Sequence, residues 1–149
     1  MTDTLFTRTD RNDMAPQWRG AWDMLDKLTG DATFVEVFAQ APELLEFVMQ
    51  QFYVKVFLGG AVEQRYKQLA RLKLSLIHGC RTCNKQKIPG ALEAGITQAQ
   101  IDALIDGDTG PFSNAERAVI YYADQIALPN MDGKMTPALL GRLRAHFSE

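Results

Sequence analysis

Both cysteines of the chain lie in one short stretch, HGCRTCNKQK, at residues 78–87. Cys80 follows a glycine where a helix is expected to begin, and the free N–H groups of a helix start favour a negative charge. A thiol there has a lowered pKa and carries more of the reactive thiolate at neutral pH. Cys83 lies one turn further on, close enough to form a disulfide with Cys80. The pair thus offers a redox cycle without a bound cofactor. One sulfur is oxidised to a sulfenic acid, the other converts it to a disulfide, and a thiol reductant restores both.

Two other interpretations of the cysteines have weaker support. Structural zinc takes four nitrogen or sulfur ligands, and the chain offers only Cys80, Cys83, His78 and His146. Because His78 sits two residues before Cys80, a poor spacing for joint ligation, no metal site is expected. The pair can also be two inert core thiols, since free cysteine is among the most buried residue types. His78 is more often a packed side chain than a base, but its place beside the thiols makes it a candidate titrating group.

Length and composition exclude several classes of protein. The 149 residues are the usual size of one domain, and 46% of them are hydrophobic. The net charge of −2 gives no basic face for a nucleic acid. No run of 18 apolar residues suggests a membrane span, and the polar N-terminus lacks the apolar core of a secretory signal. A cytoplasmic protein is therefore expected, and there a Cys-x-x-Cys pair more often serves redox or metal chemistry than a structural disulfide.

Apolar residues at helical spacing divide the chain into segments that end at glycines or prolines. The first 14 residues are expected to form a loose arm. Helices are expected at 17–30, 34–39, 42–59, 62–77 and 80–94, and after capping patterns at Thr97, Ser113 and Thr136. Pro89 is expected to interrupt the helix over 80–94, because proline removes a hydrogen bond from a helix interior. No segment alternates like a strand, so a single all-α domain spanning 1–149 is predicted.

The segment before the cysteines, 62–77, is expected to be an amphipathic helix. Its apolar residues include Tyr66, Leu69, Leu72, Leu74, Leu76 and Ile77. Its basic residues fall mostly on the other side, and they are Arg65, Lys67, Arg71 and Lys73.

Three stretches of the chain, RLKLSLIHGCRTCN, ALEAGIT and FSNAERAVIYYADQIAL, together resemble one protein family. They are similar to the carboxymuconolactone decarboxylase family, whose superfamily includes the alkylhydroperoxidase-D-like proteins. The resemblance runs from about residue 41 to the C-terminus. The Ile-x-Gly-Cys junction with the AGIT turn behind it is more specific than the Cys-x-x-Cys alone. The resemblance implies an alkylhydroperoxidase-D-like bundle of about six to eight helices. It also implies a homo-oligomer, a trimer or hexamer, with the cysteines near subunit contacts.

Redox-active members of this family carry a longer pattern: Glu, eleven residues, Cys, two residues, Cys, three residues, His. The resemblance makes Cys83 the sulfur that is oxidised first and Cys80 the resolving one, whereas the helix-start argument favours Cys80 as the more acidic thiol. The proton-relaying Glu and His of those members fall on Gln68 and Lys87. Gln68 does not ionise, and Lys87 stabilises a thiolate as a cation but is a poor base unless it is strongly desolvated. His78 stands where the family often has Asn, and it is a candidate to supply a titrating group instead.

The resemblance therefore implies a thiol-dependent peroxidase of peroxiredoxin type, or a disulfide oxidoreductase. Its expected partners are a hydroperoxide or disulfide substrate and a thiol reductant, with no cofactor, nucleic acid or membrane. The expected site residues are Cys83, Cys80, His78, Lys87 and Gln68. One alternative is a non-catalytic helical oligomer with redox-sensing thiols. Another is a lactone decarboxylase, the founding activity of the family, which needs a cationic site for a carboxylate and does not need two thiols. No such cationic cluster stands out in the sequence.

Overall fold

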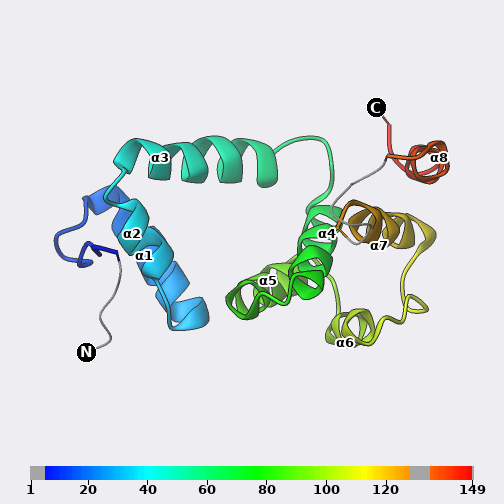
Figure 1. The fold of residues 1–149 in the computed structure, drawn as a ribbon, viewed down its shortest axis with the longest axis horizontal. Coiled ribbons are helices and arrows are strands. Elements are labelled where there is room, and N and C mark those ends of the chain that lie inside the picture. Colours follow the sequence, from blue (N-terminus) through cyan, green and yellow to red (C-terminus); the bar gives the residue numbers. More distant parts are fainter. Residues whose placement is uncertain (1–5, 128–134, 149) are drawn as a thin grey trace. The chain divides into compact units, whose positions relative to one another are not determined.

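The computed structural model describes residues 6–127 and 135–148, and every regular element within them is a helix (Figure 1). The prediction of an all-α fold is thereby confirmed. The chain divides into two compact units, Met1–Ala61 and Val62–Glu149. Each unit has its own cluster of buried apolar side chains. That the two together make one domain stays a prediction.

The first unit holds α1 (Pro16–Thr29), α2 (Thr33–Phe38), α3 (Pro42–Glu46) and η1 (Phe47–Phe57). The first two helices match the expected segments closely. Gly30 ends α1 in the left-handed conformation, with φ of 68°, which glycine adopts without steric cost. The core of this unit forms around four buried residues, Met14, Trp18, Val35 and Leu45.

Residues 6–14 are the described part of the segment that the sequence predicts as a loose arm. They make specific contacts with the rest of the first unit. The Thr9 N–H donates to the carbonyl of Glu36 at 3.0 Å, and Arg8 pairs with the carboxylate of Glu36 at 3.2 Å. Met14 is 1% exposed within the core. This part of the segment is therefore attached to α1 and α2; residues 1–5 lie outside the described chain.

The expected helix over 42–59 has a different form in the structure. After α3 the chain continues as η1, a π-helix, in which hydrogen bonds reach back five residues instead of four. The sequence predicts a wide apolar face here. Within the first unit, η1 buries none of its residues, and Phe47, Val56 and Leu58 are among its exposed or adjoining apolar side chains.

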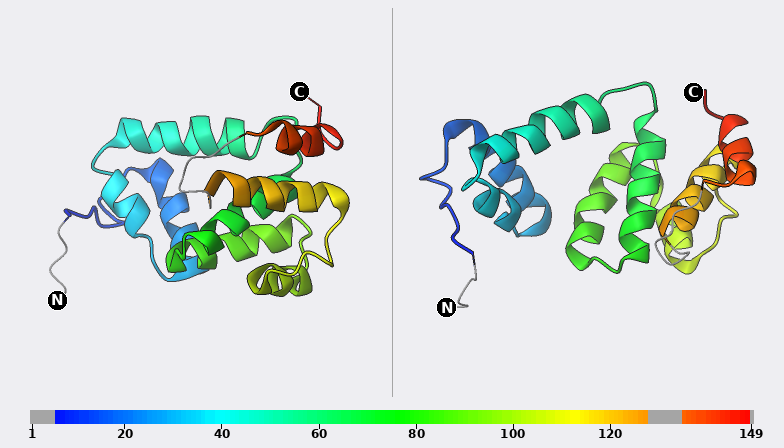
Figure 2. Two further views of the ribbon diagram at one scale, coloured as in Figure 1. Left: turned by 45° about the vertical axis from the view of Figure 1, so that its right-hand side comes forward. Right: turned by 45° about the horizontal axis from the view of Figure 1, so that its top comes forward.

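The second unit holds α4 (Gln64–Ile77), α5 (Arg81–Glu93), α6 (Gln98–Asp106), α7 (Asn114–Ala127) and α8 (Pro137–Arg144). Helix α4 packs against both α5 and α7, and Figure 2 shows α4 and α5 side by side. The largest cluster of buried apolar residues in this unit comes from α4, α5, α6, α7 and the loops beside them, and its members are Leu69, Leu72, Ala91, Ile96, Ile101, Leu104, Phe112, Val119 and Ile120.

The three capping patterns of the second unit are confirmed. Thr97 and Gln100 form a capping box at the start of α6. Ser113 and Glu116 bond reciprocally at the start of α7, with the Ser113 N–H donating to Glu116 at 2.8 Å. The hydroxyl of Thr136 accepts the Leu139 N–H at the start of α8. Short-range polar patterns therefore position these three helix starts.

The predicted break at Pro89 is wrong, because α5 continues through Pro89 to Glu93 without interruption. Proline loses one helical hydrogen bond but has a φ that suits a helix. Packing against α4 holds this stretch, since Ala91 is fully buried and Ile88 lies against the same core. Tertiary contacts thus outweigh the local preference of one residue.

A buried polar network fixes the first turn of α4. The guanidinium of Arg65 donates to the carboxylate of Glu116 at 2.6 Å, to Oε1 of Gln100 at 3.1 Å, and to the carbonyl of Gly95. Burial alone would raise the pKa of Glu116, but the Ser113 N–H and Arg65 outweigh this and hold that pKa below its usual value. The network joins α4 to the end of α5 and to the starts of α6 and α7.

None of the helices within the described ranges combines the length and the apolar character that crossing a membrane requires.

Candidate functional site

The turn between α4 and α5 delivers the first cysteine to the start of a helix. Gly79 follows the end of α4 with a φ of 62°. Its N–H donates to the carbonyl of Leu76 at 3.1 Å, and the Cys80 N–H donates to the carbonyl of Ser75 at 3.2 Å. These two bonds are those of a Schellman motif, which closes a helix through a left-handed residue. A glycine at position 79 therefore ends α4 and places Cys80 at the N-cap of α5.

Both cysteines lie at the first turn of α5, as the sequence predicts. The Sγ of Cys80 accepts the backbone N–H of Cys83 at 3.2 Å, so the sulfur itself caps the helix. The two sulfurs are joined as a disulfide, and both residues are half-buried. The N–H groups and dipole of the helix start would stabilise negative charge on either sulfur after reduction. The arrangement is compatible with a redox role.

A polar seam runs along the contact between α4 and α5, from the cysteines toward the other end of α5. We define it by Ser75 and Asn84, Arg71 and Lys87, and Gln68 and Gly90. The buried hydroxyl of Ser75 lies 2.6 Å from Oδ1 of Asn84 and 2.9 Å from the carbonyl of Leu72. The residues Gln68, Arg71 and Ser75 recur every three or four positions, so they lie on one face of α4.

Lys87 and Arg71 place two positive charges at the middle of this seam. Desolvation by burial lowers the pKa of Lys87, and the charge of Arg71 lowers it further. Lys87 follows Cys83 by four residues, so the two side chains leave α5 on the same face. A cation at this position favours thiolate, and a lowered pKa also makes the amine a better proton acceptor than an ordinary lysine.

Gln68 lies at the far end of the seam, where the redox-active family pattern has Glu. It is 8% exposed, and its Oε1 has no hydrogen-bond partner among the described residues. Its amide packs on Gly90, where a Cβ would come within 3.0 Å of Nε2. Any larger residue at 90 would have to displace this amide. The Gln68 amide thus packs closely on Gly90, but its Oε1 makes no hydrogen bond, which is uncommon in protein interiors.

His78 lies at the C-cap of α4, beside Gly79, and it is exposed. Its ring makes no hydrogen bond to any other residue that the structure describes. The structure therefore brings Cys80, Cys83, Lys87 and Gln68 onto α5 and the α4–α5 contact, and leaves His78 outside the seam. Its proposed titrating role stays a prediction.

The sequence analysis missed three residues of the seam: Arg71, Ser75 and Asn84. Arg71 was expected on the side of the helix opposite the apolar residues, together with Arg65. In the structure Arg65 enters the buried network and Arg71 lies near Lys87. The three-and-four spacing from Gln68 along α4 was a signal that could have found Arg71 and Ser75. Asn84 gives no such signal, because its partner lies on another helix.

Within residues 6–127 and 135–148, no group of three or more His, Cys, Asp or Glu residues is arranged to hold an ion.

The fold and the site together define a class of protein, a helical bundle with a Cys-x-x-Cys disulfide at a helix start. The sequence model of the carboxymuconolactone decarboxylase family matches residues 42–125, which is more than half of the chain. The chain belongs to this family. The match covers α3, η1, α4, α5, α6 and most of α7, and so includes both cysteines and the whole seam. Neither the comparison with curated proteins nor that with solved structures gave a match.

Proposed function

We propose that the chain is a thiol-dependent peroxidase that uses Cys83 and Cys80. The observation that carries the proposal is the disulfide at the first turn of α5, with the Cys80 sulfur accepting the Cys83 N–H. Disulfide formation within one turn requires no rearrangement of the helices. Membership of a family that includes peroxidase-like enzymes supports the same activity.

The proposed reaction has two steps. The thiolate of Cys83 attacks the distal oxygen of a hydroperoxide, the O–O bond breaks, and an alcohol leaves after taking up a proton. The resulting sulfenic acid is then attacked by the thiolate of Cys80, which forms the disulfide and displaces hydroxide, and the hydroxide takes up a proton to leave as water. An external dithiol reductant returns two electrons and two protons. The same pair can transfer these electrons to a disulfide substrate.

The seam would provide the electrostatic part of this reaction. Lys87 and Arg71 favour the thiolate of Cys83 and the anionic leaving group. The lowered pKa of Lys87 also suits it to exchange a proton near the cysteines. Gln68 offers an amide where the redox-active pattern has a carboxylate, so it cannot transfer a proton in the way that a glutamate does. His78 is the candidate for a titrating group from the solvent side.

The test is a titration of the reduced protein with hydroperoxide. Two thiols should disappear for each hydroperoxide consumed, and Cys83→Ser should abolish the reaction. Cys80→Ser should still form one sulfenic acid, which a dimedone-type reagent traps, but no disulfide within the chain. The peroxidase proposal would be wrong if hydroperoxide consumed thiols in neither the parent protein nor Cys80→Ser. Loss of the first step in Cys80→Ser alone would reverse the roles of the two cysteines. Separately, an unchanged rate and pH profile in His78→Ala would remove His78 from the mechanism.

The replacement of the family relay by Gln68 and Lys87 favours a second function, that of a redox sensor without turnover. A redox sensor forms its disulfide once and slowly. It does not continue to consume hydroperoxide when a thiol reductant is supplied. The double variant Gln68→Glu and Lys87→His restores the relay pattern and should convert such a sensor into a faster peroxidase. If the parent protein already matches the rate of this variant, the sensor interpretation fails.

A third candidate is lactone decarboxylation, which needs a cationic site for a carboxylate; Arg71 and Lys87 are two cations close enough for the charge of Arg71 to lower the pKa of Lys87. Decarboxylation does not need the thiols. Decarboxylase activity that survives in a Cys80→Ser, Cys83→Ser double variant would therefore favour this third function over redox chemistry.

We also infer a cytoplasmic homo-oligomer of three or six copies, as the family resemblance implies. The apolar side chains of η1, which the first unit leaves unburied, support association. Sedimentation velocity on the oxidised and reduced protein measures the size of the assembly. A monomer at all concentrations would contradict this inference.

A further inference from the structure

The two sulfurs of the disulfide have different surroundings. Cys80 occupies the N-cap of α5, and its Sγ accepts the backbone N–H of Cys83 at 3.2 Å. The Sγ of Cys83 accepts no hydrogen bond from any group that the structure describes. Because a hydrogen bond to a charged acceptor is strong, the site stabilises negative charge on the Cys80 sulfur more than on the Cys83 sulfur.

This asymmetry bears on how the disulfide is reduced. When a thiolate opens a disulfide, one sulfur takes up the incoming sulfur and the other leaves as a thiolate. The thiol with the lower pKa leaves faster. The N–H of Cys83 and the dipole of α5 both act on Cys80, which makes Cys80 the better leaving group.

Lys87 has the opposite influence, because its charge favours a thiolate at Cys83, four residues earlier in α5. Desolvation by burial lowers the pKa of Lys87, and no described group forms a hydrogen bond or ion pair with it. The Cys83 N–H acts on Cys80 at hydrogen-bond distance, whereas Lys87 acts on Cys83 as a charge one helical turn away. The hydrogen bond to Cys80 is therefore the stronger of the two influences.

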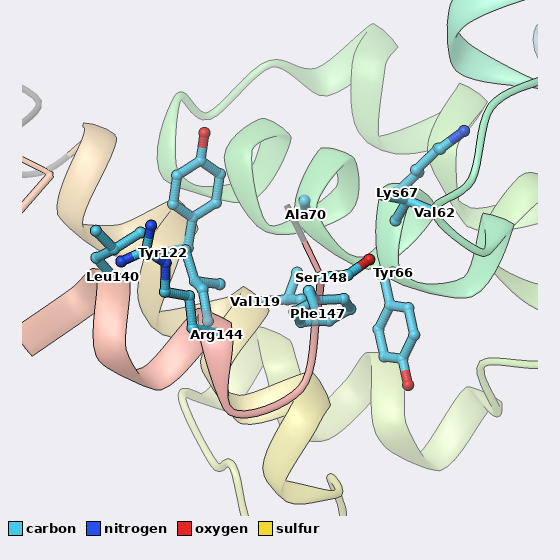
Figure 3. Close-up of a pocket in the computed structure, with 11 residues that line it drawn as sticks. Val62, Tyr66, Lys67, Ala70, Val119, Tyr122, Leu140, Arg144, Phe147 and Ser148 are labelled. Carbon is cyan, nitrogen blue, oxygen red and sulfur yellow. The ribbon is translucent and has the colours of Figure 1, made fainter.

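Access does not favour either sulfur. Both cysteines are half-buried. A pocket of about 400 Å³ in the second unit is lined by residues of α4, α7 and α8 and by the short segments that flank them (Figure 3). No residue of α5 lies in its wall, so a reductant does not reach the disulfide through this pocket. The choice between the two sulfurs then depends on which one leaves more easily.

We infer that the reductant attacks the Sγ of Cys83 and that Cys80 leaves as the thiolate. A thiolate of the dithiol reductant forms a bond to the Cys83 sulfur, and the bond between the two cysteines breaks with its electron pair on Cys80. The second thiolate of the reductant then attacks the reductant sulfur of this mixed disulfide. Cys83 is released as a thiolate and takes up a proton, and the reductant becomes a disulfide.

The inference rests on the proposed redox function and adds a division of labour to it. Cys83 reacts with both external partners, first with the hydroperoxide and later with the reductant. Cys80 exchanges bonds with Cys83 alone. The greater acidity expected of Cys80 and the initial oxidation of Cys83 therefore concern different steps of one cycle.

The test identifies the sulfur that carries the mixed disulfide. The oxidised full chain is mixed with excess glutathione and quenched in acid within seconds, and the free thiols are alkylated before digestion with trypsin. Arg81 lies between the two cysteines, so trypsin places Cys80 in peptide 74–81 and Cys83 in peptide 82–85. Mass spectrometry should find glutathione on peptide 82–85 about fivefold more often than on peptide 74–81. Glutathione equally or mainly on peptide 74–81 would overturn the inference. No hydroperoxide is used, so this result is independent of whether the protein is a peroxidase.

Two lysine variants test why Cys80 is the leaving sulfur. Lys87→Met should raise the preference for Cys83 as the attacked sulfur, because it removes the charge that favours Cys83 as the leaving group. Lys85→Met changes an exposed residue of the same helix and should match the parent protein. A preference that falls in Lys87→Met but not in Lys85→Met would also overturn the inference, since Lys87 would then select the leaving sulfur.

Discussion

Two polar clusters lie along the same helix, α4, and they differ in how completely their groups are paired. In the network at its first turn, Arg65 reaches three acceptors, and both oxygens of Glu116 accept hydrogen bonds. In the seam toward the cysteines, the Oε1 of Gln68 has no partner among the described residues, and Lys87 lies near a second cation. The named polar groups of the first cluster are all paired, whereas the second cluster contains one unpaired amide oxygen.

This difference separates a structural task from a chemical one. A buried network in which every group is paired specifies one arrangement of helices. Unpaired atoms and like charges cost stability, and they are tolerated where a protein needs a perturbed group. The cysteines lie next to the second kind of cluster. The contrast therefore supports the seam, and not the Arg65 network, as the surroundings of the proposed thiol chemistry.

The largest expected effect comes from breaking the network between Arg65 and Glu116. Glu116→Ala leaves the guanidinium of Arg65 and the Ser113 N–H without their partner, so the free energy of unfolding should fall by about 3 kcal/mol. Urea unfolding followed by circular dichroism measures this. Glu63→Ala, an exposed residue at the start of α4, is the control and should change stability by less than about 0.5 kcal/mol. Similar losses in both variants would contradict the role of the network.

Acid should weaken the same cluster. The pKa of Glu116 is lowered in the folded chain, so its contribution is present above its ordinary value of 4.5 and is lost as the pH falls through the folded value. Glu116→Gln should therefore flatten the fall in stability below about pH 4.5. An unchanged acid limb in this variant would show that other carboxylates control it.

The next prediction compares two buried glutamines whose replacement should change the free energy of unfolding in opposite directions. Gln100→Met removes an amide that accepts from Arg65 and donates to the carbonyl of Pro111, so stability should fall by about 2 kcal/mol. Gln68→Met removes an unpaired oxygen while keeping the shape of the side chain, so stability should rise by about 1 kcal/mol. Thermal unfolding of both variants measures the pair. A loss at Gln68 as large as that at Gln100 would mean that the seam is paired after all.

A smaller effect concerns the hydrogen bond that joins the two helices of the seam. Ser75→Ala leaves Asn84 without the buried hydroxyl, and stability should fall by about 1 kcal/mol. The reduced protein should also react more slowly with hydroperoxide, since Asn84 follows Cys83 directly. Ser113→Ala in the other cluster should lower stability without changing that rate. A rate that is unaffected by Ser75→Ala would confine Ser75 to a structural role.

The smallest effect comes from the charge at Lys87. Its folded pKa is lowered, so the unfolded chain binds the proton more tightly, and stability should rise as the pH increases from the folded pKa toward the ordinary value of 10.5. Lys87→Met should remove this slope and stabilise the protein at neutral pH by less than about 1 kcal/mol. The exposed Lys85 provides the control, as Lys85→Met. A slope that persists in Lys87→Met would assign it to another group.

Sequence patterns predict the structural features that depend on residues close together in the chain. Helix starts at Thr97, Ser113 and Thr136 follow from short capping motifs, and the place of Cys80 follows from the glycine before it. Such features depend on contacts within a few residues. The family pattern likewise identified Gln68 and Lys87 before their surroundings were known.

Contacts between distant segments could not be predicted in this way. Arg65 meets Glu116 across 51 positions of the chain, and no periodicity within 62–77 indicates such a partner. The same holds for Arg71 near Lys87, which depends on how α4 and α5 align. Pro89 is the opposite case, in which a local pattern predicts a break that does not occur. Packing on α4 keeps α5 helical through this proline.

The disulfide between Cys80 and Cys83 closes a ring across only three positions of the chain. The loop-closure entropy removed from the unfolded chain by so small a ring amounts to about 2 kcal/mol, less than for a long loop. The N–H groups of Gly79 and Cys80 donate to the carbonyls of Leu76 and Ser75, and neither bond involves a cysteine sulfur. If the pair cycles as proposed, we therefore expect these backbone bonds to persist after reduction, so that opening the ring costs the fold little stability.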